Sequence, residues 1–212
     1  NETNWTWSNT AQYVTQIGKH NIDVLGGMEV SKQSVIDFSA YSEGYALEDK
    51  DYMWPNAATG TMRNSGAKVG YRLASFFGKV NYNWDDLLLA SFTIRHDGSS
   101  RFGKAHRWGT FPSVSVAWRA SQEKWFPKND YINDLKVRAG YGVTGSQASV
   151  GNYSYLASYN TSVYPFGISS GNQTALVSST LANPYIHWEE VAQTNIGFDA
   201  SLFNSRVMFS FD

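Results

Sequence analysis

Between Leu87 and Trp118, apolar and polar side chains alternate strictly on either side of a Gly/Ser-rich stretch. Successive side chains of a β-strand point to opposite faces, so this period of two predicts two strands joined by a turn. Their apolar positions are Leu88, Ala90, Phe92, Ile94, Val114, Val116 and Trp118. The opposite positions are Ser91, Thr93, Arg95, Asp97, Ser113, Ser115 and Arg119. A soluble antiparallel sheet alternates in the same way, so the surroundings of the apolar face must be inferred from the rest of the chain.

Six further segments alternate in the same way and bring the predicted number of strands to eight. They are Thr3–Ile17, His20–Lys32, Ala67–Trp84, Leu135–Val143, Ala192–Phe203 and Arg206–Phe211. Their polar positions include the charged residues Asp23, Glu29, Lys136, Arg138 and Asp199. The whole pattern predicts an all-β, antiparallel fold.

The predicted connections fall into short and long ones. Tight turns are expected at Gly18-Lys19, Asp85-Asp86 and Asn204-Ser205. A single helical turn, Gln122–Phe126 with Ser121 as its N-cap, is expected before the strand at Leu135. Two long loops are expected at Gln33–Gly66 and Thr144–Trp188.

Loop length therefore separates the two ends of the predicted sheet. Short turns at one end and extended loops at the other are typical of an outer-membrane β-barrel, in which the short turns lie in the periplasm. Trp84, Trp118 and Phe203 fall near the tight-turn end, where an aromatic girdle is expected. The sequence thus predicts an antiparallel transmembrane β-barrel, with charged positions facing its lumen and apolar positions facing lipid.

The composition narrows the functional classes. The 212-residue chain has no cysteine and a formal net charge of −1, which excludes a disulfide framework or thiolate metal site and argues against nucleic-acid binding. Aromatic residues make up 16% and charged residues 17%, a balance that suits an interface between water and lipid. No apolar run of about 18 residues is present, so no transmembrane helix is expected. Strand patterns continue to Asn1 and Asp212, so we expect a fragment of a larger barrel.

No stretch carries the signature of an enzyme or a cofactor site. Gly140–Gly145 has the form GxGxxG, but no helical pattern follows it, as a dinucleotide site would require. The run Glu48–Asp51 lacks the spacing of a calcium loop, and no GxSxG elbow is present. The histidines, which also lack ligand spacing, are His20, His96, His106 and His187. We therefore expect no catalytic residue, metal or cofactor.

Several motifs together resemble the SusC/RagA family of TonB-dependent outer-membrane transporters. One group is formed by Asp97–Gly103, Arg107–Gly109 and Phe111–Ser113. The others, which follow the order of the family, are Gly18–Asn21, Asp134–Arg138, Tyr141–Gln147 and Gln193–Gly197. Each motif alone is weak, but the set is specific and extends along nearly the whole chain.

This resemblance implies a fragment of about eight strands from a plugged barrel of about 22 strands. Residues 1–212 would form a partial barrel domain, without the plug domain, the TonB box and the remaining strands. The family imports oligosaccharides or peptides with energy relayed by TonB, and a SusD-like surface lipoprotein acts as its lid. We therefore expect a non-enzymatic importer in the outer membrane, in contact with membrane lipid.

Cargo recognition would involve the long loops and the upper wall of the lumen, where aromatic side chains can stack on sugar rings. The candidates for contact with cargo are Trp54, Tyr153, Tyr155, Tyr159, Tyr164 and Arg95. An ordinary role in loop packing remains open for each of the aromatic residues. In the external turn, Arg101 and Arg107 are expected to form stabilising ion pairs with Asp97.

Two alternatives fit the same alternation. A complete, passive barrel of eight strands predicts closure between Thr3–Ile17 and Arg206–Phe211. A secreted, glycan-binding β-sandwich predicts that Val114, Val116 and Ile196 are buried in a common core.

Overall fold

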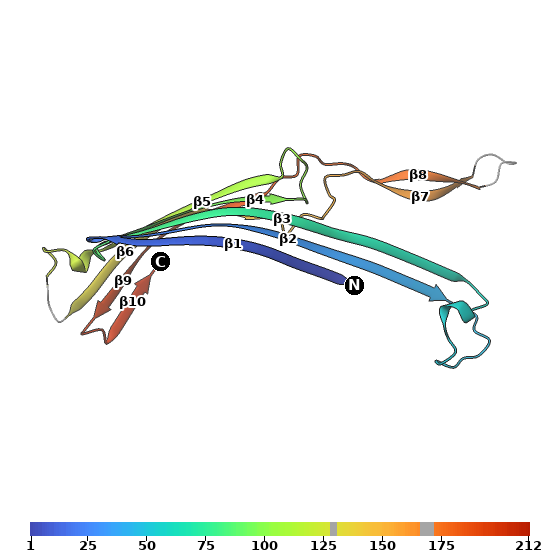
Figure 1. Ribbon diagram of the computed structural model, residues 1–212, viewed down its shortest axis with the longest axis horizontal. Coiled ribbons are helices and arrows are strands. Elements are labelled where there is room, and N and C mark those ends of the chain that lie inside the picture. Colours follow the sequence, from blue (N-terminus) through green and yellow to red (C-terminus); the bar gives the residue numbers. More distant parts are fainter. Residues whose placement is uncertain (128–130, 166–171) are drawn as a thin grey trace.

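Eight antiparallel strands form one curved sheet in the computed structural model, which describes residues 1–127, 131–165 and 172–212 (Figure 1). The order along the sheet is β1-β2-β3-β4-β5-β6-β9-β10, so nearly all neighbours in space are also neighbours in sequence. The strands are β1 (Glu2–Ile17), β2 (His20–Ser42), β3 (Met62–Trp84), β4 (Leu88–Ser99), β5 (Trp108–Arg119), β6 (Ile132–Ser146), β9 (Glu189–Leu202) and β10 (Val207–Phe211). The predicted antiparallel fold and the eight strands of the main sheet are confirmed.

The strand register gives the sheet two chemically distinct faces. Phe92 lies opposite Val80 on one side and Val114 on the other, and these positions belong to what we call the apolar face. Ser91 lies opposite Asn81 and Ser115, which belong to the polar face. The charged residues that the sequence assigned to one side share the polar face; they are Asp23, Glu29, Arg95, Arg119, Lys136, Arg138 and Asp199.

Tight turns join the strands at one end of the sheet. Between β3 and β4, Asp85 and Asp86 have φ angles of 52° and 55°, a left-handed conformation that Asp and Asn tolerate better than most residues. Asn204 has a φ of 55° in the β9–β10 turn, and its N–H donates to Asn133 Oδ1 at 2.7 Å. Gly18 has a φ of 61° between β1 and β2. All three predicted turns are therefore present.

The first long loop is much shorter than predicted. β2 and β3 pair with each other as far as Ser42 and Met62, although β1 pairs with β2 only up to Val35 and β4 pairs with β3 only up to Leu73. The outer parts of β2 and β3 thus form a two-stranded ribbon that projects beyond the sheet (Figure 1). The two strands of the ribbon satisfy each other's backbone hydrogen bonds. The ribbon therefore forms without the alternation of apolar and polar residues from which strands are predicted.

Two further predictions of local structure are corrected. The predicted loop 144–188 contains an additional hairpin of β7 (Ser158–Pro165) and β8 (Asn172–Thr180). The helical turn is the 3₁₀ helix η2 (Ala120–Gln122), which begins earlier than predicted; a second one, η1 (Pro55–Ala57), lies in the β2–β3 connection. Ser121 lies inside η2 and donates to Asp134 instead of capping a helix.

Most large apolar side chains of the sheet remain exposed in this chain. Val114, Val116 and Ile196 are 46%, 47% and 67% exposed, so the common core of a sandwich is absent from the described residues. β1 and β10 lie at opposite edges of the sheet and do not pair, so the closure expected of a small barrel is not formed either. Among the residues that the structure describes, no helix has the length and hydropathy needed to cross a bilayer.

Candidate functional site

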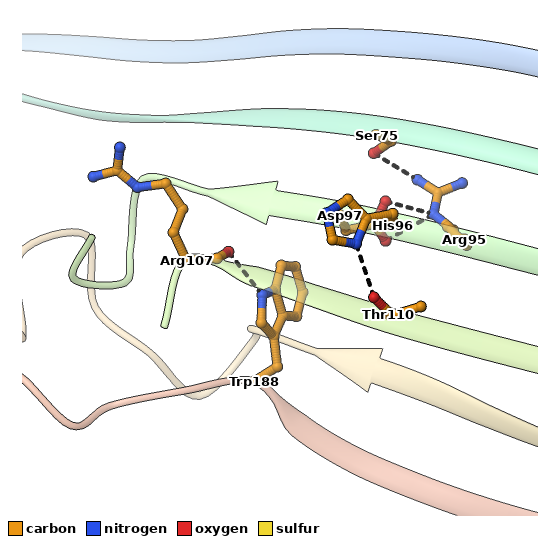
Figure 2. Close-up of polar contacts among 7 residues, drawn as sticks. All are labelled: Ser75, Arg95, His96, Asp97, Arg107, Thr110 and Trp188. Atoms are coloured by element: carbon orange, nitrogen blue, oxygen red, sulfur yellow. Dashed lines mark hydrogen bonds and ion pairs between the residues drawn. The ribbon is translucent and has the colours of Figure 1, made fainter. Parts of the chain in front are cut away.

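Aromatic side chains gather in two rows on the apolar face. Near the tight turns, His20 stacks on Trp84 with their ring centroids 6.5 Å apart. Near the other end, His96 stacks on Trp108 with their ring centroids 4.8 Å apart. The Nδ1 atom of His96 lies 2.8 Å from Thr110 Oγ1 (Figure 2). Apolar positions such as Phe92 lie between the two rows. Flat rings with polar edges are favoured where an apolar medium meets water, so the rows mark two boundaries of the apolar face.

On the polar face, side chains from β1 to β4 form a continuous hydrogen-bond network. Asp23 accepts from Gln12 Nε2 at 2.7 Å and from Asn81 Nδ2 at 3.1 Å. The Oδ1 atom of Asn81 in turn accepts from Ser91 Oγ at 2.9 Å. Residues of this network, together with Lys136 and Arg138, line a hollow of about 510 Å³. This half of the polar face therefore carries a connected set of hydrogen-bonding side chains.

Arg95 is held by an ion pair and a hydrogen bond on the polar face. Its Nε donates to both carboxylate oxygens of Asp97, at 2.9 and 2.7 Å, and its Nη2 donates to Ser75 Oγ at 2.9 Å (Figure 2). Ser75 is 1% and Asp97 8% exposed. The guanidinium therefore neutralises a buried carboxylate, and only part of its hydrogen-bonding capacity is left for cargo.

A second cation is bound near the other edge of the sheet. Arg138 lies 3.3 Å from Asp199 and 2.7 Å from Asp212. Ser210 also donates to Asp199, at 2.7 Å. The charges of the polar face are thus largely paired with each other across β6, β9 and β10.

At the end of the sheet with the long connections, three rings from separate segments form a buried cluster. Phe102 is 0% exposed, and the Trp188 ring lies 5.0 Å from it and 5.4 Å from Phe111. Trp188 Nε1 donates to the backbone oxygen of Arg107 at 3.0 Å (Figure 2). A Cβ atom at Gly109 or Gly145 would overlap the Phe111 ring, so these glycines make room for the cluster. We call Phe102, Phe111 and Trp188 the loop anchor, because they fix the β4–β5 loop to the segment before β9.

The sequence did not predict the loop anchor. Phe111 lies two residues before Ser113, so the alternation places it on the polar side of its strand and not among apolar residues. Phe102 and Trp188 lie in predicted loops. Their proximity depends on how two distant loops fold, which no periodicity encodes.

The predicted ion pairs of the external turn are wrong in their partners. Asp97 pairs with Arg95 and not with Arg101 or Arg107. The guanidinium of Arg101 lies over the Tyr71 ring at 4.2 Å, and its Nη1 donates to the Gln147 backbone oxygen at 2.9 Å. Arg107 holds the turn through its backbone, while its side chain extends away from Trp188 (Figure 2). Proximity in the sequence suggests Arg101 and Arg107 as partners, whereas the strand register places Ser75 opposite Asp97, and Arg95 lies two residues away on the same face of β4.

The predicted cargo residues are spread over separate parts of the chain. Trp54 lies in the loop at the tip of the β2–β3 ribbon and Tyr159 lies on β7, and the two are 66% and 62% exposed. Tyr155 is half-buried near Gly103, whereas Tyr153 is exposed. The backbone of Tyr164 belongs to β7, but its side chain lies outside the described residues. The candidates therefore do not form one site within this chain, and their role in binding cargo stays a prediction.

The ribbon leads into an ordered loop. Trp54 Nε1 donates to the Asp51 backbone oxygen at 3.1 Å. Hydrogen bonds from Thr61 and from the Tyr41 hydroxyl hold the pKa of Glu43 below its usual value. The loop at the tip thus has internal order of its own.

The GxGxxG stretch does not have the surroundings of a dinucleotide site. Gly140–Gly145 lies within β6, and the bends and turns that follow contain no helix that could bind a pyrophosphate. In the described part of the chain, no group of three or more His, Cys, Asp or Glu side chains is placed to bind a metal ion.

Comparison with known proteins agrees with this architecture. The family model for the β-barrel of TonB-dependent receptor-like proteins matches residues 1–212. TonB-dependent receptor P3 of Formosa agariphila is 32% identical over 100% of this chain, and TonB-dependent receptor SusC of Bacteroides thetaiotaomicron is 30% identical over 99%. The chain spans only 21% and 20% of these relatives, respectively.

A solved structure shows the same arrangement of strands. A chain of the RagAB peptide transporter superposes with a TM-score of 0.86 at 28% identity, over 99% of this chain and 23% of its own length. The fold, the two-faced sheet and the match over every residue lead to one assignment: the chain belongs to the TonB-dependent receptor family and forms part of its outer-membrane β-barrel.

Proposed function

We propose that the full-length protein containing this chain imports oligosaccharides or peptides across the outer membrane. The observation that carries the proposal is the height of the apolar face between its two aromatic rows. Trp84 and Ala74 lie ten residues apart in β3, and Ala74 pairs with Gly98, which lies beneath the Trp108 ring. Ten residues extend about 34 Å along a strand, or about 26 Å along the membrane normal at a tilt of ~40°. This height is close to the apolar band of ~25 Å in outer-membrane barrels.

The polar face would then form the wall of a wet lumen. Its paired charges and its amide and hydroxyl groups would be costly next to lipid, but they can bind water, a plug or cargo. In our proposal residues 1–212 are a segment of the barrel wall, and the plug and TonB-binding parts belong to the remainder of the full-length protein. The protein moves its cargo without chemical change.

The two cargo classes of this proposal have different support. The solved RagAB structure is that of a peptide transporter, which supports peptides, whereas oligosaccharides are supported by the motifs that resemble the SusC/RagA family. We propose a SusD-like surface lipoprotein as partner and suggest that it covers the external loops. Trp54, Tyr153, Tyr155 and Tyr159 are the described aromatic side chains that we expect cargo or the lipoprotein to meet, with Tyr164 as a further candidate.

Uptake by cells that express the full-length protein tests this proposal. Labelled oligosaccharides and labelled peptides of defined length serve as probes, and accumulation is measured before and after collapse of the proton-motive force and in cells without TonB. We expect uptake of one of the two cargo classes, with loss of most of it in both treatments. Uptake that persists without TonB would indicate a passive barrel, and a protein that stays soluble without detergent would indicate a secreted sandwich.

A further inference from the structure

Four cations surround a hollow at the outer border of the apolar face. Lys32 on β2 lies directly opposite Arg72 on β3, and Lys68 lies further along β3 with the same orientation. Arg107 contributes to the same hollow, which has a volume of about 700 Å³ and also includes Trp108. We call these four residues the basic cluster.

The basic cluster lies just outside the apolar band. Arg72 is two residues beyond Ala74 and twelve residues from Trp84 along β3. Twelve residues correspond to about 31 Å along the membrane normal at the same tilt, a few Å above the upper aromatic row. The apolar face therefore changes from apolar to cationic at the level where lipid headgroups would lie.

Nothing within the described chain neutralises these charges. None of the four side chains forms an ion pair or a hydrogen bond with another described residue, and Arg107 Nε is buried without a partner. The carboxylates at a similar level, Glu29 and Asp97, belong to the polar face. Like charges directly opposite each other on paired strands are destabilising, so Lys32 and Arg72 create a local need for an anion.

The rest of the hollow is suited to a lipid. Its lower part contains Val30, Ala74 and Gly98, which are continuous with the apolar band. A free anion could contact only the cationic rim, whereas a phosphorylated lipid could place its phosphate on the rim and its chains on the apolar residues below. Arginine and lysine bind phosphate oxygens through charge-assisted hydrogen bonds.

We propose that the basic cluster binds the phosphate of a membrane-embedded glycolipid of the outer leaflet, of the class to which lipid A belongs. This inference rests on the proposed membrane orientation, and it adds a lipid site on the outside of the barrel. Lys32 and Arg72 hold the phosphate from β2 and β3, Arg107 approaches from the β4–β5 loop, and Trp108 packs against the sugar or the first part of the acyl chains.

Lipid binding by the full-length protein tests this site. The purified protein is placed in nanodiscs of zwitterionic phospholipid and titrated with bisphosphorylated lipid A or with its dephosphorylated form, and bound lipid is measured by native mass spectrometry. Each cation near a membrane surface contributes about fivefold to binding of an anionic lipid, so we expect Lys32→Gln with Arg72→Gln to weaken binding about 25-fold. Lys50→Gln with Lys104→Gln removes two exposed loop cations outside the basic cluster and should leave binding unchanged.

The unmodified protein alone can refute the inference. Equal binding of the phosphorylated and dephosphorylated lipids would overturn it, as would inorganic phosphate that competes at the same concentration as the lipid. Either result would leave the membrane orientation intact. Failure of the protein to enter nanodiscs at all would instead refute the proposed orientation on which the lipid site depends.

Discussion

At the scale of single residues, several charges on the polar face are paired within their own strand or with the next strand. Arg95 reaches Asp97 on its own strand and Ser75 on β3, and Arg138 reaches Asp199 on β9. The alternation of the sequence predicted that these side chains share one face, because the period of a strand fixes their direction. It did not predict which side chains form ion pairs with one another. The partner of Asp97 depends on the strand register and on the competition among Arg95, Arg101 and Arg107.

Loss of the Arg95 side chain tests this arrangement. Arg95→Ala leaves the carboxylate of Asp97 buried and unpaired, so we expect the full-length protein to lose about 1–3 kcal/mol of stability. The readout is the thermal transition of the detergent-purified protein. Lys79→Ala is the matched control, because Lys79 lies on the same face and forms no ion pair in the described part of the chain. Equal effects of the two substitutions would contradict the role of the ion pair.

At the scale of elements, strands that cross the apolar band were predictable and those beyond it were not. β1, β4 and β5 match the predicted segments within a few residues, since one face of each meets an apolar surface and the other does not. The sequence did not predict the outer ribbon of β2 and β3 or the hairpin of β7 and β8, because two strands can pair without an apolar face. The loop anchor was not predicted for a related reason. Its three rings come from separate segments, and the two that are furthest apart in the sequence, Phe102 and Trp188, are separated by 86 residues.

A methyl group at Gly145 tests the loop anchor. Gly145→Ala would force its Cβ into the Phe111 ring, and overpacking of this kind costs about 1–3 kcal/mol. We expect the β4–β5 loop to loosen, so that limited proteolysis cuts the full-length protein between Ser99 and Trp108 more rapidly. In contrast, Gly140→Ala on the same strand brings its Cβ to an ordinary 3.6 Å from Ser115 and should leave the cleavage rate unchanged. Similar cleavage of both variants would argue against the packing of Phe111 as the cause.

At the scale of the whole molecule, the two faces of the sheet explain why so many apolar side chains lie on its surface. The described chain buries few large apolar residues, and those of the loop anchor lie at one end. A sheet of this kind is stable only when a bilayer covers its apolar face and when its edges are paired, since an open edge leaves backbone groups unsatisfied in lipid. The lengths of the relatives are consistent with this, because they are about five times longer than this chain.

Two adjacent substitutions test which face meets lipid. Phe92→Arg puts a cation near the middle of the apolar band, at a cost of about 2–4 kcal/mol, and should strongly reduce assembly in the outer membrane. Ser91→Arg puts the same charge on the polar face, at the edge of the hollow on that face, and should be tolerated. Assembly is measured as the fraction of the full-length protein that is folded in outer-membrane preparations, from its heat-modifiable migration on gels. Equal losses would show that the facing assignment is wrong.

The ribbon formed by the outer parts of β2 and β3 has a mechanical consequence. On its β4 side, β3 continues for eleven residues beyond Leu73, about 37 Å, with no strand of the described chain beside it. A sheet edge that projects without a neighbour bends more easily than the interior of a sheet, so thermal motion should be larger at the tip of the ribbon than in the wall below it. A protein that grips the tip would therefore act on a lever, and a small displacement there would be passed down two continuous strands into the wall itself.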